Sequence, residues 1–167
     1  MTNKNNKKGF TIIEVVLVLA IAGLIFLMVF IALPALQRSQ RNTRRRQDMA
    51  RILSAFNDYQ ANNNGNFPKS GKLDEFATKY IKTGSDDTFT DPDGSPYEWD
   101  GPYTYGESEK IPTPGKDDLA EGKHKIGVFY KAKCDGESVK EDDKGGARSL
   151  AITYTLEGGA VYCGDNQ

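Results

Sequence analysis

The sequence predicts an α+β fold in which a long N-terminal α-helix packs on a small C-terminal antiparallel β-sheet. Residues 15–36 carry no charged side chain, and a helix of about 20 apolar residues is long enough to cross a bilayer. An apolar stripe with helical spacing continues beyond that run. In the last third of the chain, apolar and polar residues alternate as they do in half-buried strands.

Charge is unevenly distributed along the 167 residues, although the net charge is only -1. Residues 38–51, the basic neck, carry six arginines and one aspartate, a net charge of +5. From Ile52 onward, 13 lysines and arginines face 21 acidic residues, a net charge of -8. The neck is interpreted as a solvated basic surface, with anionic lipid headgroups, acidic surfaces of neighbouring subunits and DNA phosphates as alternative partners. Its arginines are Arg38, Arg41, Arg44, Arg45, Arg46 and Arg51.

The first nine residues, MTNKNNKKG, are polar and basic and lead directly into the apolar run. A secretory signal would place a small-residue cleavage site after a short apolar core, whereas here the small residue, Gly9, precedes a long one. Glu14 lies just inside the run, where an ionised carboxylate costs about 2.5–3.5 kcal/mol at mid-membrane. Glu14 is therefore expected to have a cationic partner or another role.

The stretch KGFTIIEV at residues 8–15, followed by the apolar helix, resembles the class III leader of type IV pilins and pseudopilins. The resemblance implies the pilin fold, cleavage by a prepilin peptidase between Gly9 and Phe10, and N-methylation of the new terminal Phe10. It also implies that Glu14 pairs with the Phe10 amine of a neighbouring subunit in a filament. The alternative is that Glu14 extends to the lipid headgroups.

Four segments follow from this interpretation. They are a cleaved basic leader (residues 1–9), a transmembrane or filament-core helix (10–36), an amphipathic continuation of that helix (37–61) and a globular head (62–167). Gly23 and Pro34 are the candidate kink positions in the helix, since proline removes a backbone hydrogen bond. Pro34 lies three residues later than the helix proline common in the resembled family.

Beyond the neck, Met49, Ile52 and Phe56 continue the helical period, and Gly65 is expected to cap the C-terminus of the helix. Ser70 is expected to cap a second, short helix that ends at Gly84. Residues 84–118 are predicted to be loop-rich. The aromatic residues of that loop either form an adhesive or glycan-binding surface or, as favoured here, pack back onto the head: Tyr97, Trp99, Tyr103 and Tyr105.

The C-terminal third predicts strands at residues 126–132 and 150–156, and Gly158-Gly159 predicts a hairpin turn into a last strand. The charged, glycine-containing residues 135–146 are expected to form a surface loop. Cys134 and Cys163 are the two cysteines of the chain. In a domain outside the cytosol such a pair predicts a disulfide, the alternative being two buried free thiols.

No catalytic constellation is found in the sequence, so an enzyme, a metal site and a cofactor are not expected. The single histidine, His124, lies between two lysines and is interpreted as solvated. Asp86, Asp87, Asp91 and Asp93 could ligate calcium, but their spacing does not complete an EF-hand loop.

The resemblance implies a structural subunit of a type IV pilus. An assembly platform with an ATPase would polymerise it with copies of itself into a surface filament for adhesion, twitching motility or DNA uptake, with DNA or a host surface as further candidate partners. Before assembly it would be a single-pass protein of the cytoplasmic membrane with its head outside. The arginines that follow the span oppose this orientation by the positive-inside rule. Alternatives are a pseudopilin of a secretion or competence machine and a membrane-anchored binding domain that does not polymerise.

Overall fold

A computed structural model describes residues 9–82, 89–106, 112 and 124–167. It divides the chain into two compact units, Met1–Ser39 and Gln40–Gln167, which are considered separately below. The second is called the globular unit. Leader residues 1–8, Gly84, Asp86 and Asp87 lie outside the described residues.

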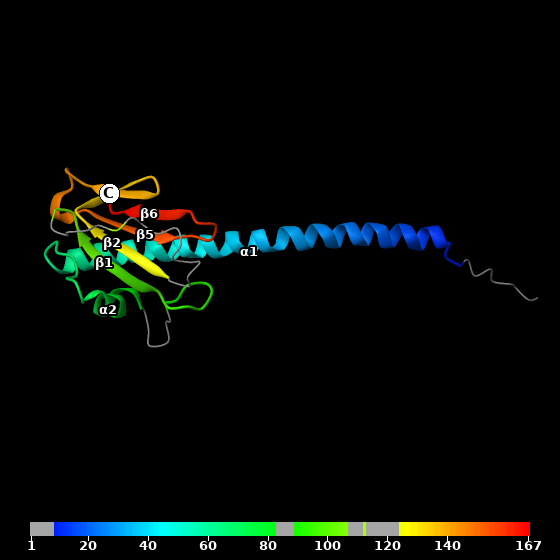
Figure 1. Cartoon of the computed structure of the whole chain (residues 1–167). Helices are drawn as coiled ribbons and strands as arrows, with labels where there is room; N and C mark the ends of the chain where they lie inside the picture. The colour runs from blue at the N-terminus through cyan, green and yellow to red at the C-terminus, as the bar shows by residue number, and fades with distance from the viewer. Residues whose placement is uncertain (1–8, 83–88, 107–111, 113–123) are drawn as a thin grey trace, which may run out of the picture. The chain divides into compact units, whose positions relative to one another are not determined.

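Helix α1 (Ile12–Asn62) is continuous and includes Pro34 (Figure 1). At its C-terminus Asn64 and Gly65 adopt positive φ angles of 56° and 79°. The Gly65 amide donates a hydrogen bond to the Gln60 carbonyl at 2.8 Å. This is the expected glycine-containing cap, with Asn64 taking the first left-handed position.

The main sheet has the strand order β1-β2-β5-β6. Its neighbours pair antiparallel, as predicted, except that β1 runs parallel to β2. Strand β1 was not predicted, because its residues fall in the stretch interpreted as loop. The four strands are β1 (Glu98–Thr104), β2 (Lys125–Tyr130), β5 (Leu150–Thr155) and β6 (Val161–Asp165).

A second, two-stranded sheet is formed by β3 (Ala132–Asp135) and β4 (Ser138–Glu141). The strand predicted at 126–132 is divided at Lys131, whose φ of 55° ends β2. Strand β4 occupies part of the segment expected to be a loop. The disulfide between Cys134 and Cys163, with a Cα–Cα distance of 5.8 Å, joins this sheet to β6.

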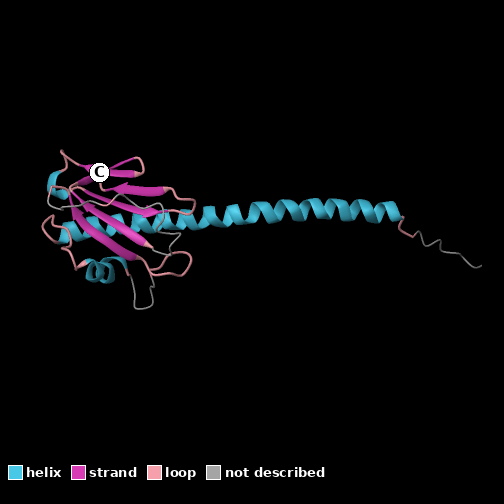
Figure 2. Ribbon diagram, in the orientation of Figure 1, coloured by secondary structure: helices cyan, strands magenta, loops and turns pink. Residues whose placement is uncertain are grey.

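The main sheet lies against the C-terminal part of α1 (Figure 2). The helix contributes fully buried side chains at the positions that share one face. Phe56 is central, because it stacks on Phe76 at 4.3 Å between ring centroids and meets Trp99 edge-on at 6.5 Å. The fully buried apolar residues of helix and sheet are Met49, Ile52, Phe56, Ile126, Val128, Leu150, Ala151 and Ile152.

The predicted short helix is present as α2 (Leu73–Phe76) followed by the π-helical turn η1 (Ala77–Ile81). The prediction that Ser70 caps it is wrong, because Lys72 occupies the cap position and no side chain caps the helix. Burial of its apolar face in the core fixes the helix instead. A 3-10 turn, η2 (Gly146–Arg148), precedes β5.

Candidate functional site

The predicted processing site precedes the helix. Gly9, Phe10 and Thr11 are not helical, and the Phe10 side chain is 90% exposed. A Cβ atom added at Gly9 would meet nothing within 4 Å. Within its own unit this segment is therefore exposed. A peptidase that binds residues on both sides of the bond between Gly9 and Phe10 could reach it.

Thr11 and Glu14 form a reciprocal capping box at the start of α1. The Thr11 amide and its hydroxyl both donate to Glu14 Oε2 at 2.8 Å, and the Glu14 amide donates to Thr11 Oγ1 at 3.4 Å. This arrangement satisfies backbone donors that the first helical turn leaves unpaired. The role of Thr11 was missed, although its signal is local: a threonine three residues before a glutamate at the start of an apolar run.

The helix after Glu14 presents bare apolar surface. Large apolar side chains between Phe10 and Leu36 are at least 48% exposed, and Phe30 is 74% exposed. Among the described residues, α1 is the one helix long and apolar enough to cross a membrane. Gly23 lies on it with open space around its Cα. So large an exposed apolar surface requires lipid or another protein surface.

The neck arginines that lie in the globular unit are not uniformly solvated. The Arg45 side chain is 2% exposed, and its Nε and Nη2 atoms donate to both Asp91 carboxylate oxygens at 2.6 and 2.7 Å. Its Nη1 atom donates to Glu157 Oε1 at 2.7 Å. Arg41 donates to both Glu157 oxygens, at 2.6 and 2.7 Å. The interpretation of the neck as a solvated surface is therefore wrong for Arg41 and Arg45.

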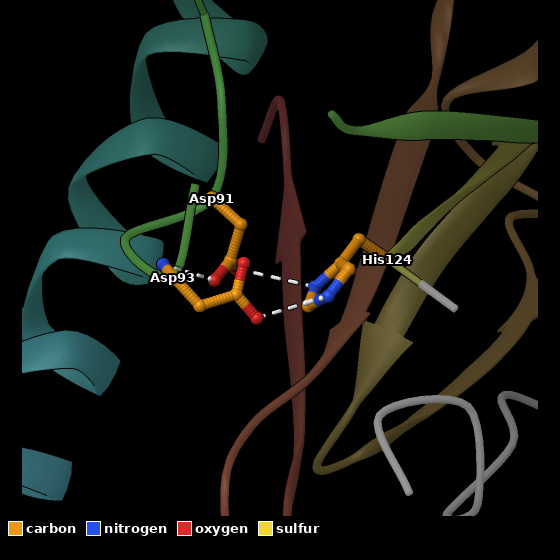
Figure 3. Close-up of side chains that lie close together, drawn as sticks. All are labelled: Asp91, Asp93 and His124. Carbon is orange, nitrogen blue, oxygen red and sulfur yellow. Dashed lines mark hydrogen bonds and ion pairs between the residues drawn. The ribbon is translucent and has the colours of Figure 1, made fainter. Parts of the chain in front are cut away.

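The interpretation of His124 as solvated is also wrong, because the residue is 5% exposed. It directly precedes β2, so the alternation of that strand turns His124 inward. Tyr154 donates its hydroxyl hydrogen to Asp91 Oδ2 at 2.7 Å, and His124 Nδ1 lies 2.9 Å from that hydroxyl oxygen. On the other side of the ring, Nε2 faces Asp93 Oδ2 at 3.1 Å (Figure 3).

Both acidic partners of the arginines are held ionised. Burial acts to raise the pKa of Asp91, but the hydrogen bonds from Arg45 and Tyr154 outweigh it and keep that pKa below its ordinary value of 3.8. The hydrogen bonds from Arg41 are the largest cause that lowers the pKa of Glu157 to about 2. The cluster is thus a charged network at neutral pH.

Asp91, Asp93 and His124 place one ligand atom each within 4.8 Å of one another, a spacing that could hold a metal ion. Both Asp91 oxygens already accept hydrogen bonds from Arg45, whose positive charge opposes a cation at the same carboxylate. The Asp91 and Asp93 carboxylates also accept backbone hydrogen bonds within their own loop. The geometry therefore favours an ion-pair network that holds this loop against α1.

The aromatic residues after this loop pack onto the globular unit. Trp99 lies against Phe56 and Phe76. The tyrosine hydroxyls donate hydrogen bonds to neighbouring groups: Tyr97 to Asp48, Tyr103 to Asp100 and Tyr105 to the Val139 carbonyl. These contacts favour the packing interpretation over an adhesive surface.

Comparison with known proteins finds a match for one segment of the chain. A family model described as the prokaryotic N-terminal methylation motif matches residues 4–30. No curated protein and no solved structure matches the chain. The matched segment contains Gly9, Phe10 and the capping box, and it ends within the exposed apolar part of α1. Residues 4–30 therefore carry the N-terminal methylation motif, which is the class III prepilin leader of type IV pilins.

Proposed function

We propose that the chain is a structural subunit of a type IV pilus that is processed in the membrane and polymerised into a surface filament. The observation that carries this proposal is the methylation motif, which extends into an exposed apolar helix. A bilayer covers that surface before assembly and the helices of neighbouring copies cover it afterwards. Burial of apolar surface contributes about 25 cal/mol per Å², so the same side chains suit both states.

Glu14 has two roles in this proposal. Within its own chain, it closes the capping box with Thr11 through Oε2. Between chains, its carboxylate pairs with the terminal amine of Phe10 of a neighbouring subunit. A free α-amine has a pKa of about 7.7–8.0 and is largely protonated at neutral pH. Either charge buried alone would be costly, so the pair sets the register of one subunit against the next.

The arginine contacts bear on the positive-inside rule, by which the arginines that follow the span oppose a head outside the membrane. Arg41 and Arg45 are bound to Glu157 and Asp91, so in the folded protein two of the neck charges are neutralised by carboxylates of the same chain. This supports placing the head outside the cytoplasmic membrane. The partners of this proposal are the prepilin peptidase, the assembly platform with its ATPase, the bilayer and further copies of the chain.

The processing step is tested by the intact mass of protein extracted from cells that express the peptidase. The expected product begins at Phe10 and carries one additional methyl group. A Gly9→Leu variant should keep its full length, because a side chain would occupy the position at which the peptidase requires none. A wild-type chain that retains residues 1–9 would contradict the proposal and favour a non-polymerising membrane anchor.

The two roles of Glu14 are separated by matched variants imaged for filaments. Glu14→Gln keeps an acceptor for the capping box, because glutamine serves at this position as well as glutamate, but removes the charge. Thr11→Ala removes the hydroxyl of the capping box and keeps the charge. We expect normal cleavage in both, with filaments lost only in Glu14→Gln. Normal filaments from Glu14→Gln would refute the register role, and no surface fibres from the wild type at native expression would favour a pseudopilin.

A further inference from the structure

A groove of about 1050 Å³ opens at the end of the globular unit where α1 ends. Its walls come from the last turn of α1, the segment 63–70 that follows it, α2 with η1, the C-terminal ends of β1 and β2, and η2. Figure 1 shows these elements together at the end of the globular unit where α1 terminates. All of the lining residues lie in the part of the chain that the structure describes. None of them takes part in the ion pairs of Arg41 and Arg45.

The groove is positively charged in an acidic region of the chain. Its lining includes Lys69, Lys72, Lys79 and Lys131 against a single acidic residue, Glu75, a net charge of +3. From Ile52 onward the chain carries a net charge of -8. Glu75 is paired with Lys72 at 2.8 Å. The groove therefore carries a local positive charge, opposite in sign to the net charge of residues 52–167, and attracts an anion.

Side-chain amides line the same groove and divide into two groups. Asn63 and Asn66 hold the turn itself, since their amides donate to the carbonyls of Tyr59 and Asn63 at 2.8 and 2.9 Å. Asn62 and Asn64 are exposed and have no side-chain partner among the residues that the structure describes. Each unused amide offers two donors and an acceptor, the complement of neighbouring hydroxyl groups on a sugar.

The aromatic residues of the groove are already paired with one another. Phe67 stacks on Tyr130 with 4.6 Å between centroids and 9° between planes, and the Tyr130 hydroxyl donates to the Pro68 carbonyl at 2.7 Å. Tyr59 meets Tyr80 edge-on at 5.2 Å. Proteins that bind single-stranded nucleic acid offer aromatic faces on which bases stack. These rings instead form a rigid floor, which disfavours a nucleic acid ligand.

We propose that this groove binds an anionic glycan, a hydroxyl-rich chain that bears carboxylate or phosphate groups. Asn62 and Asn64 would bind the sugar hydroxyls, and Lys69 and Lys79 would bind the acidic groups. The proposal concerns the surface of the globular unit and does not depend on filament assembly. It assigns to the protein a ligand beyond its own copies and the membrane.

The test uses the full chain in detergent micelles and isothermal titration calorimetry with four probes. These are a galacturonic acid hexasaccharide, a phosphorylated maltohexaose, unmodified maltohexaose and a single-stranded DNA of twelve nucleotides. We expect binding of at least one acidic glycan, and the first two probes show whether carboxylate or phosphate is preferred. No binding of either acidic glycan, equal binding of the neutral one, or tighter binding of the DNA would overturn the proposal.

Variants then locate the ligand. Lys69→Gln with Lys79→Gln should weaken binding about tenfold, and Asn62→Ala with Asn64→Gly should weaken it about fivefold. Glycine at position 64 keeps the left-handed backbone that the turn requires. The matched control, Lys125→Gln with Lys144→Gln, removes the same charge elsewhere and should change affinity less than about twofold.

The Glu75→Gln variant should bind the acidic glycan more tightly than the wild type. It raises the charge of the groove and releases Lys72 from its ion pair, so it should tighten binding about two- to threefold. Wild-type affinity in the double lysine variant, or weaker binding in Glu75→Gln, would show that the ligand binds elsewhere. The thermal unfolding of every variant, followed by fluorescence, shows that the fold is retained.

Discussion

The ion pair between Arg45 and Asp91 offers the sharpest test of how the globular unit is held together. The Asp91 side chain is fully buried and both of its oxygens accept hydrogen bonds from Arg45. Asp91→Asn keeps the shape of the side chain but removes its charge. It also points an amide donor at a guanidinium that can only donate. The variant therefore leaves a buried arginine with one of its two counter-ions missing.

Removing one partner of a buried ion pair costs about 3–5 kcal/mol. Glu157 remains 2.7 Å from Arg45 Nη1 in this variant and compensates part of the lost charge, so we expect the lower end, about 3 kcal/mol of unfolding free energy. For a unit of this size 1 kcal/mol corresponds to about 3–5 °C in Tm. The expected decrease in Tm is therefore about 10 °C.

Trp99 is the only tryptophan of the chain, and its contacts with Phe56 and Phe76 lie in the core of the globular unit. Its fluorescence during heating of the full chain in detergent therefore reports unfolding of that unit. The matched control is Asp74→Asn, which removes the same charge from an exposed position and should change Tm little. A loss below about 1 kcal/mol for Asp91→Asn, the range of an exposed pair, would refute the structural importance of this ion pair.

Three further predictions concern other contacts of the same unit. The hydrogen bonds from Arg41 are the largest cause that lowers the pKa of Glu157 from 4.5 to about 2. The pair therefore stabilises the fold above about pH 4.5, and this stabilisation is lost as the pH falls toward 2. When Tm is measured over this pH range, a Glu157→Gln variant should lose less stability than the wild type. Replacing both Cys134 and Cys163, 29 residues apart, by serine should cost about 3–4 kcal/mol in denaturant unfolding, and an unchanged midpoint would contradict this. Gly127→Ala would place a methyl group in overlap with side chains of β2 and β5 and should cost about 1–3 kcal/mol, measured in the same way.

The features that the sequence predicted correctly depend on local signals. The apolar run, the helix end at Gly65 and the hairpin turn at Gly158 are each encoded within a few residues. The two cysteines allow a single pairing, so the disulfide needed no knowledge of the fold. In each of these cases the residues that determine the structure are near one another in the sequence or have no competing partner.

The features that were missed depend mostly on partners far apart in the sequence. Strand β1 includes Gly101 and Pro102, which argue against a strand, and it is held by parallel pairing with β2. His124 was predicted to be solvated because of its two lysine neighbours, but its side chain contacts Tyr154, thirty residues away. Thr11 is the exception, because its capping box was visible in the sequence.

The basic neck shows why charge patterning alone gave the wrong interpretation there. A run of arginines beside an acidic region suggested a solvated basic surface, with external anions as alternative partners, but three of the arginines bind different segments of their own chain. Arg41 holds the turn between β5 and β6 through Glu157, Arg45 holds the loop before β1 through Asp91, and Arg51 donates to the Ile81 carbonyl at the end of η1. Two of the six neck arginines therefore pair with carboxylates of their own chain, and a third binds a backbone carbonyl. Lysine could not replace Arg45, because only a planar guanidinium can bind both oxygens of Asp91 and reach Glu157 as well.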